Sequence, residues 1–361
     1  MNNRHIRDYG IQIGSLPTGQ YNSIGDIPGV TVGHSTIDTD THKTGVTVIL
    51  PSQDNIFARK LVAASYILNG FGKTAGTIQI NELGTLESPI ALTNTLNVGL
   101  VQDALVSYMA ERCQKEEIPF FSFNPVVGEC NDCHLNDIKD RAVTASHVLA
   151  AIDSASADFA QGDVGAGKGT ICFGLKGGIG SSSRQLNING NTYHLGVLVQ
   201  SNFGRLEDLV IQDREIGKKI QTYQKKQEKA AQGERIGQKD EGSIMSIIAT
   251  DLPLSSRQLH RILKRASIGL GRTGSHVGHG SGDVMIGFST ANVIPVTSKE
   301  PFTQIQALNE SYMDLPFRAV IEAEEEAVLN SLAAADTVAG YTGTVCHSLD
   351  SYRELLKRGK L

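Results

Sequence analysis

The sequence contains no tryptophan, and its aromatic residues together make up only 6% of 361 residues. The core must therefore be built mostly from aliphatic side chains. Long apolar runs are also missing, because no stretch reaches the roughly 20 residues that a helix needs to cross a bilayer. The first 14 residues include basic side chains but no apolar run behind them. We therefore expect no membrane partner, no secretory signal and a cytoplasmic location.

The chain also lacks an excess of positive charge. Its formal net charge is -5, whereas nucleic-acid binding favours a basic surface, so we expect no nucleic-acid partner. Cysteine is scarce and odd in number, at five residues. In a chain without an export signal, such cysteines are more typical of reduced thiols than of a disulfide framework. With 40% hydrophobic and 20% charged residues, the composition is that of an ordinary globular protein.

Glycine is abundant, at 38 residues, and predicts many tight turns and close backbone approaches. β-branched runs between these glycines predict strands, and amphipathic stretches predict helices. Strands are predicted at 23–35, 44–51, 169–186, 193–204, 243–250 and 282–292, a strand passing into a helix at 88–116, and helices at about 141–160, 255–272 and 316–335. These elements lack a regular βαβ rhythm, which favours layered α/β sheets over a doubly wound parallel sheet.

Residues 213–241 differ from everything around them. They are rich in lysine, glutamate and glutamine and have few β-branched apolar residues. Such a composition cannot bury enough apolar surface to form a packed element. We predict an exposed, flexible and partly helical linker over 213–241.

Three motifs resemble cofactor or metal sites, but each departs from the pattern that the chemistry needs. In the P-loop-like stretch 162–170, GDVGAGKGT, Gly169 stands where a serine or threonine must reach the metal. The stretch 130–134, CNDCH, has the spacing of haem attachment, which normally requires export, and we interpret it as two ordinary thiols in a loop. The stretch 276–283, HVGHGSGD, is a glycine-rich loop that does not fix two rings on one metal as a helix would. We therefore expect no metal and no organic cofactor.

The Gly242–Ser243 step lies between the linker and the strand predicted at 243–250. A serine hydroxyl beside the preceding carbonyl can attack it and convert the amide into an ester, which water then hydrolyses. The new N-terminal serine would carry both a nucleophile and a base, because an α-amine titrates at about 7.7–8.0. Glycine tolerates the strained geometry that such an attack needs. Taken alone, however, the common dipeptide also fits an ordinary strand start.

A wider pattern gives the Gly-Ser step its meaning. The motifs PVVGEC, LNDI, GAGKGTICFGLKGGIGSSSR, VLVQSNFG, GSIMSIIATDLPL and GSGDVMIGFSTAN together resemble the L-aminopeptidase/D-esterases, relatives of the β-peptidyl aminopeptidases. The likeness covers nearly the whole chain. It implies an α/β fold, a four-layer α/β/β/α sandwich similar to N-terminal-nucleophile hydrolases but with different connectivity. It also implies one interwoven domain cut into a larger chain, 1–242, and a smaller chain, 243–361.

The resemblance implies a role for each of five residues. Ser243 would be the nucleophile, and Asn202 of SNFG would donate its side-chain amide to the oxyanion. Ser281 and Asp283 of GSGD match the hydroxyl and carboxylate that support the nucleophile, although the family often has the longer glutamate at the second position. Glu129 of VVGEC would hold the free amine of the substrate, with an ordinary surface carboxylate as the alternative.

The activity implied is that of a self-processing serine aminopeptidase. It would release N-terminal residues from small peptides, amides or esters, including peptides of β-amino acids, without a cofactor. Several processed chain pairs would assemble into a homo-oligomer. Two alternatives remain at this point: an acyltransferase of the ornithine acetyltransferase type, which uses threonine at the cleavage point, and a non-catalytic binding protein with the same fold.

Overall fold

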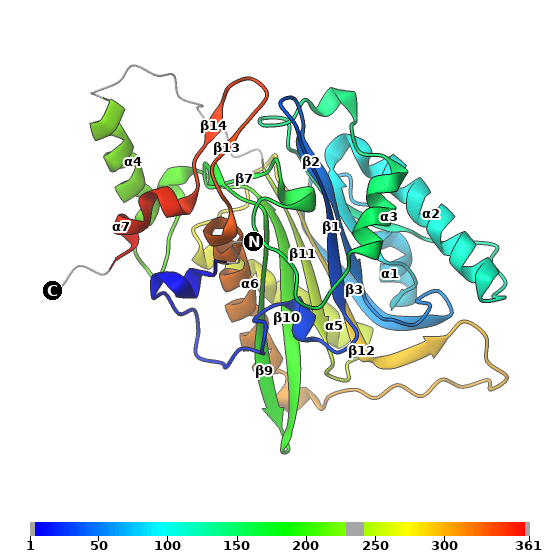
Figure 1. The fold of residues 1–361 in the computed structure, drawn as a ribbon. Helices are drawn as coiled ribbons and strands as arrows, with labels where there is room; N and C mark the ends of the chain where they lie inside the picture. Colours follow the sequence, from blue (N-terminus) through cyan, green and yellow to red (C-terminus); the bar gives the residue numbers. More distant parts are fainter. Residues whose placement is uncertain (1–3, 229–241, 358–361) are drawn as a thin grey trace.

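The computed structural model describes residues 4–228 and 242–357 of the chain. Figure 1 shows two sheets lying face to face, with helices on their outer sides. The first sheet has the strand order β1-β2-β5-β6, and only β5 and β6 in it are parallel. Its strands are β1 Thr31–Asp38, β2 Lys43–Leu50, β5 Ile90–Asn94 and β6 Val126–Cys130.

The second sheet has the order β4-β3-β12-β11-β10-β9. Its neighbours are antiparallel except for β11 and β12, which run parallel in the middle of the sheet. Its strands are β3 Arg59–Gly70, β4 Thr85–Leu86, β9 Ile179–Ile188, β10 Asn191–Asn202, β11 Ser243–Thr250 and β12 Gly282–Pro295. The two strands that follow residue 242, β11 and β12, therefore lie between β3 and β10, which precede it, so a cut there would leave two chains joined by backbone ladders.

Three apolar cores separate the four layers. Helices α2 (Val98–Lys115) and α3 (Ala145–Asp153) pack on the first sheet, and α5 (Ser256–Arg272) and α6 (Asp314–Ala334) pack on the second. A third core fills the space between the two sheets. The predicted α/β/β/α sandwich is confirmed.

All eight residues of β11 are buried, because this strand has a core on each side. Met245 and Ile247 face the core between the sheets, whereas Ile244 and Ile248 face α5 and α6. Side chains alternate along a strand, so Ser243 lies on the same face as Met245. The face that carries Ser243 is therefore the one turned toward the first sheet.

Most predicted elements are confirmed, and three predicted bounds are wrong. The strand expected at 23–35 is β1, which begins only at Thr31, because Ile24–Asp26 form a 3-10 turn. The helix expected at about 141–160 is α3, which covers only Ala145–Asp153. The strand expected over 169–186 is broken by Phe173 and Gly174, whose positive φ angles of 50° and 66° close a two-residue hairpin turn. The shorter elements are α1 Thr77–Leu83, β7 Ile171–Cys172, β8 Leu175–Lys176, α4 Ile216–Glu228, β13 Val338–Ala339, β14 Val345–Cys346 and α7 Arg353–Leu356.

The predicted linker 213–241 is only partly covered by the structure. Its first half forms α4, which lies beside α7 near the C-terminal end of the described chain (Figure 1). Residues 229–241 lie outside the described residues. Among the helices that the structure describes, none has the length and hydropathy needed to cross a bilayer.

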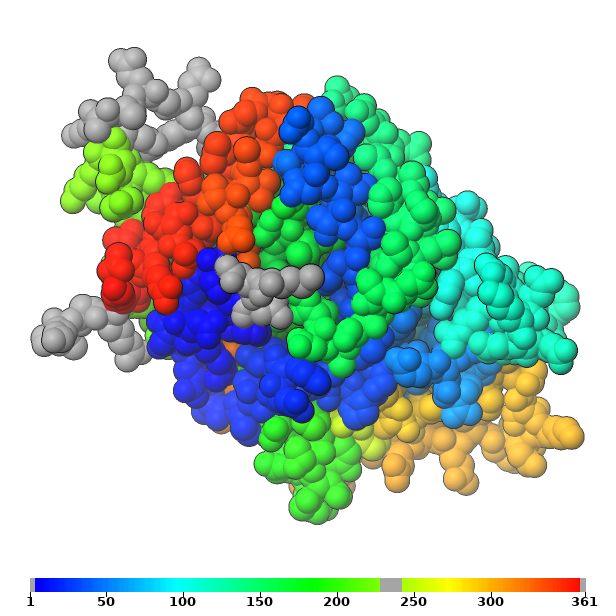
Figure 2. Space-filling view, in the orientation of Figure 1, coloured from blue at the N-terminus to red at the C-terminus, as the bar shows by residue number. Residues whose placement is uncertain are grey.

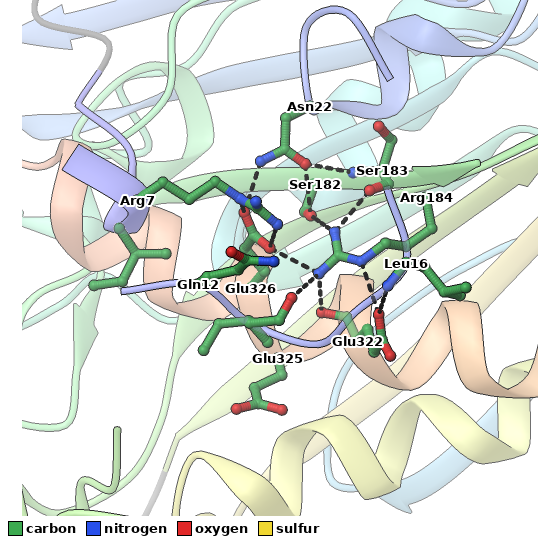
Figure 3. Close-up of polar contacts among 12 residues, drawn as sticks. Arg7, Gln12, Leu16, Asn22, Ser182, Ser183, Arg184, Glu322, Glu325 and Glu326 are labelled. Atoms are coloured by element: carbon green, nitrogen blue, oxygen red, sulfur yellow. Dashed lines mark hydrogen bonds and ion pairs between the residues drawn. The ribbon is translucent and has the colours of Figure 1, made fainter. Parts of the chain in front are cut away.

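A buried ionic network fastens the N-terminal segment to α6 and β9 (Figure 3). The Arg184 guanidinium binds the carboxylates of Glu326 at 2.7 Å and Glu322 at 3.3 Å. From the N-terminal segment, Arg7 and Asn22 also bind Glu326, at 2.8 and 2.7 Å. Dense pairing of this kind offsets the free-energy cost of burying the charges. On the surface the dark blue segment that begins at residue 4 and the red segment that ends at residue 357 lie side by side (Figure 2), and the Tyr9 hydroxyl donates a hydrogen bond to Asp350.

Candidate active site

Ser243 begins β11, between β10 and β12, and is 8% exposed. Its hydroxyl donates a hydrogen bond to the carbonyl oxygen of Gly242 at 2.8 Å. The backbone N–H of Gly282, the neighbour of Ser243 on β12, lies 3.3 Å from Ser243 Oγ and 3.1 Å from the Gly242 oxygen. The hydroxyl thus lies against the peptide bond that the sequence singles out, with a backbone donor beside both oxygens.

Gly242 is required by close packing. A Cβ atom on Gly242 would lie 2.2 Å from the carbonyl oxygen of Asn202 and 2.4 Å from Cα of Phe203. Real Cβ atoms do not approach backbone atoms this closely, so a side chain at position 242 would push Ser243 away from β10. The sequence predicts glycine here for its tolerance of strain, whereas the structure requires it because there is no space for a side chain.

Asn202 lies directly opposite Ser243 in the antiparallel ladder between β10 and β11. Residues paired in this way present their side chains on the same face, about 5 Å apart at Cβ. The Oδ1 atom of Asn202 accepts a hydrogen bond from the backbone N–H of Ile171 at 2.9 Å. This contact assigns Oδ1 as the acceptor end and leaves Nδ2 as the end that can donate.

Ser281 and Asp283 flank Gly282 and are both buried. The Ser281 hydroxyl donates to Asp283 Oδ1 at 2.7 Å. In the ladder with β11, Gly282 lies beside Ser243 and Asp283 lies beside Ile244. The pair therefore belongs to the segment that supports Ser243, but Gly282 is the residue in contact with the hydroxyl.

Asn69 is a supporting residue that the sequence analysis missed. Its side-chain amide donates to the backbone carbonyls of Gly278, His279 and Ser281. These contacts tie the loop before β12 to the end of β3. The sequence offers no signal for this role, because Asn69 is more than 200 residues away from the loop that it holds.

Glu129 lies on β6 with 2% of its surface exposed. One carboxylate oxygen accepts from the backbone N–H of Lys73 at 2.9 Å, and the other accepts from the hydroxyl of Thr95. None of the ion pairs among the described residues includes Glu129. This carboxylate is thus buried, hydrogen-bonded and available to a cation that comes from outside the chain.

A single cavity of about 780 Å³ joins several of these groups. It is lined by Phe71, Lys73, Thr95, Glu129, Asn131, Arg205, Gly242, Ser243, His276, Val277, Gly278, His279 and Gly280. The cavity therefore brings together Gly242, Ser243 and Glu129, three of the residues indicated by the sequence. Asn202, Ser281 and Asp283 are not among its lining residues; Asn202 lies beside Ser243 on β10, and the other two flank Gly282 on the β12 side. Lys73, Thr95 and Arg205 line the same cavity, and the sequence analysis did not single them out.

The motifs 162–170 and 130–134 have other environments. In the first, Lys168 Nζ binds the carboxylates of Asp38 at 2.7 Å and Asp163 at 2.9 Å. In the second, Cys130 is fully buried, and burial raises the pKa of its thiol well above the usual value. All five cysteines are free thiols. Within 4–228 and 242–357, no cluster of three or more histidine, cysteine or acidic side chains could hold a metal ion.

Comparison with known proteins is consistent with this arrangement. The sequence model of Peptidase family S58 matches residues 22–346. The beta-peptidyl aminopeptidase BapA of Sphingosinicella xenopeptidilytica is 38% identical over 351 residues, which cover 92% of this chain and 86% of that protein.

Two solved structures are also similar over 97% of this chain. The PH0078 protein of Pyrococcus horikoshii superposes with a TM-score of 0.89 at 43% identity, covering 97% of each chain. The L-aminopeptidase D-Ala-esterase/amidase of Ochrobactrum anthropi gives a TM-score of 0.88 at 34% identity, again with 97% of each chain covered. It is described as a prototype for the serine aminopeptidases and a new variant among the Ntn hydrolase fold. The expected similarity to N-terminal-nucleophile hydrolases is confirmed.

Proposed function

The chain belongs to peptidase family S58 and is an aminopeptidase, and on this premise we propose that Ser243 cuts its own Gly242–Ser243 bond and then serves as the N-terminal nucleophile. The observation that carries the proposal is the 2.8 Å hydrogen bond from Ser243 Oγ to the Gly242 carbonyl oxygen. An aminopeptidase of this kind acts on peptides, and the family favours hydrolysis over the acyltransferase and binding-protein alternatives.

Self-processing begins with attack of Ser243 Oγ on the carbonyl carbon of Gly242. The carbonyl oxygen gains negative charge, and the N–H of Gly282, 3.1 Å away, stabilises it. The amide C–N bond then breaks, the proton lost by Oγ passes to the nitrogen, and an ester links Gly242 to Oγ. Water hydrolyses the ester and leaves a carboxylate on Gly242 and a free α-amine on Ser243.

Turnover repeats the same chemistry on a substrate. The neutral α-amine of Ser243, with an ordinary pKa of about 7.7–8.0, accepts the hydroxyl proton as Oγ attacks the substrate carbonyl. Asn202 Nδ2 and the Gly282 N–H donate to the oxyanion. The leaving amine takes the proton, and water releases the acyl group. Ser281 and Asp283 orient the amine–hydroxyl pair.

Glu129 is the proposed anchor for the substrate's ammonium group. A buried carboxylate that lacks a cationic partner among the described residues costs free energy, and a substrate ammonium supplies that partner. The rim of the cavity has the opposite charge, since Lys73 and Arg205 line it and are exposed. A short peptide with a free amino group and a free carboxylate fits this polarity best.

Arg205→Gln is expected to lower kcat/KM about fivefold for a dipeptide with a free carboxylate, because an exposed ion pair contributes up to about 1 kcal/mol. The variant and the wild type should cleave the same dipeptide with a C-terminal amide at equal rates. Arg59→Gln is the matched control, because it removes an exposed arginine at the start of β3 that does not line the cavity. An equal effect of Arg205→Gln on both substrates would contradict a carboxylate contact.

The proposed function is tested by incubating the purified chain and examining it by denaturing electrophoresis and mass spectrometry. We expect two fragments at roughly two-thirds and one-third of 38.7 kDa, the smaller one beginning with Ser243. Cleavage of aminoacyl anilides should rise in step with the fragments. A fully active chain that stays in one piece would refute self-processing.

The proposal extends to small amides and esters as substrates, which present the same carbonyl to Ser243. It also includes a homo-oligomer of processed chain pairs, supported by the sequence resemblance alone.

A further inference from the structure

A fully buried lysine lies behind Asn202, outside the cavity that contains Ser243. Lys176 ends β8, and its side chain is 0% exposed. Its ammonium group donates to three backbone carbonyls, those of Gly167 at 2.9 Å, Thr170 at 2.8 Å and Gly177 at 2.7 Å. No carboxylate among the described residues lies within 4.0 Å of it, so carbonyl dipoles provide its close solvation.

The carbonyl of Thr170 links this lysine to the active site. Thr170 and Ile171 share one peptide group, whose oxygen accepts from Lys176 Nζ and whose N–H donates to Asn202 Oδ1 at 2.9 Å. The contacts form one continuous chain from ammonium to peptide group to carboxamide. Hydrogen bonds in such a chain polarise one another, so a positive charge at one end strengthens the donor at the other end. The donor at the other end is Nδ2 of Asn202.

We propose that Lys176 is a positioning residue that holds and polarises the Thr170–Ile171 peptide group and thereby makes Asn202 a better oxyanion donor. The inference rests on the proposed role of Asn202. The glycine-rich motif 162–170 supplies two of the three carbonyls, those of Gly167 and Thr170. A Cβ atom on Gly167 would lie 2.5 Å from the nitrogen of Ile179, and one on Gly169 would lie 2.1 Å from the oxygen of Lys43. Side chains do not fit at these positions, and the turn directs the Gly167 and Thr170 carbonyl oxygens toward a cation, the reverse of a P-loop.

Stability alone does not explain a charged lysine at this place. Burial lowers the pKa of Lys176 to about 8; Asp163, Cys346 and Cys172 act in the raising direction, and Lys168 acts in the lowering direction. The unfolded chain therefore binds the proton more tightly than the folded one, and the charge opposes folding at neutral pH. This penalty starts to fall as the pH rises above about 8, where the folded chain loses the polarising charge, and it is gone only above the ordinary lysine pKa of 10.5.

The variant Lys176→Met removes the charge and its donors but keeps a long apolar stem. We expect kcat per processed chain to fall about 10-fold to 100-fold, with KM unchanged. This loss is smaller than that for removal of an oxyanion donor, because Asn202 is weakened as a donor but still present. Lys168→Met is the matched control, because it removes a neighbouring buried lysine that binds Asp38 and Asp163. This control should keep kcat close to the wild-type value.

The pH profile separates polarisation from structural support. In the wild type, kcat should decline above about pH 8 as Lys176 loses its proton, and Lys176→Met should lack this decline. If Lys176→Met does not fold, the pH dependence of kcat in the wild type tests the proposal by itself. A level kcat from about pH 8 to pH 10, with the circular dichroism spectrum unchanged, would overturn the proposal.

A double-mutant cycle with Asn202→Ala separates this inference from the proposed function. If Lys176 acts through Asn202, then Lys176→Met should slow the Asn202→Ala enzyme no further. If the two substitutions instead lower kcat independently, so that their effects multiply, the proposed action of Lys176 through Asn202 is overturned, and the oxyanion role of Asn202 stays intact. A near-normal rate for Asn202→Ala alone would instead overturn the oxyanion role itself.

Discussion

Replacing Ser243 by alanine is expected to leave a single uncut chain of 38.7 kDa without aminopeptidase activity. The Ser243 hydroxyl supplies the attacking oxygen in both self-processing and turnover, so neither reaction has a substitute for it. The fold should survive, since the recorded contacts of Oγ are those with the Gly242 carbonyl and the Gly282 N–H. Intact-mass measurement, denaturing electrophoresis, thermal unfolding and an aminoacyl anilide assay together check this result.

Ser246→Ala is the matched control for Ser243→Ala. Ser246 lies on the same strand, but its hydroxyl donates to Glu324 of α6 at 2.6 Å and is not in the cavity. The control should be cut and active. Cleavage of Ser243→Ala at the same bond, or turnover by the uncut variant, would show that another group performs the attack.

Replacing Asn202 by alanine is expected to lower kcat by about 10²–10³, the usual cost of losing one oxyanion donor. The loss should appear in kcat more than in KM, because Nδ2 meets a full negative charge only in the transition state. Stopped assays on processed enzyme, with the processed fraction measured by electrophoresis, would give both constants.

Two further variants separate the donor from its surroundings. Asn202→Asp keeps the shape and still accepts the Ile171 N–H, but it removes the Nδ2 donors and adds a negative charge. It should be at least as slow as Asn202→Ala. Asn187→Ala removes a carboxamide at the far end of the β9–β10 hairpin, where it accepts from Thr192, and should keep normal rates. Near-normal turnover by Asn202→Asp would exclude Asn202 as the donor.

Local patterns in the sequence predict much of the fold. The helical spacing of Val98, Val101, Leu105 and Met109 predicts α2, and the structure buries all four residues. The continuous apolar run after Ser243 gives β11, which has a core on each side. The break at Phe173 and Gly174 was missed because phenylalanine rarely adopts a positive φ. In the structure its ring packs against Phe203 and its backbone N–H donates to the Phe203 carbonyl.

The candidate site was predicted less completely. Motif resemblance singles out Ser243, Asn202 and Glu129, and the structure places them on β11, β10 and β6. It could not indicate Gly282, whose backbone N–H contacts both oxygens at the Gly242–Ser243 step, because a backbone donor leaves no mark in the residue type. The motifs could not indicate Lys176 either, because all three hydrogen-bond partners of its ammonium group are backbone carbonyls.

The sequence by itself determined the layered fold and the family, because apolar periodicity and long motifs are properties of neighbouring residues. It also determined that a serine follows a glycine at the start of a buried strand. Only the tertiary structure decided that Glu129 is buried beside Ser243 in one cavity, that Gly242 has no space for a side chain and that Lys176 contacts the peptide group holding Asn202. Strand register and packing bring these distant segments together, so the contacts depend on how the whole chain folds.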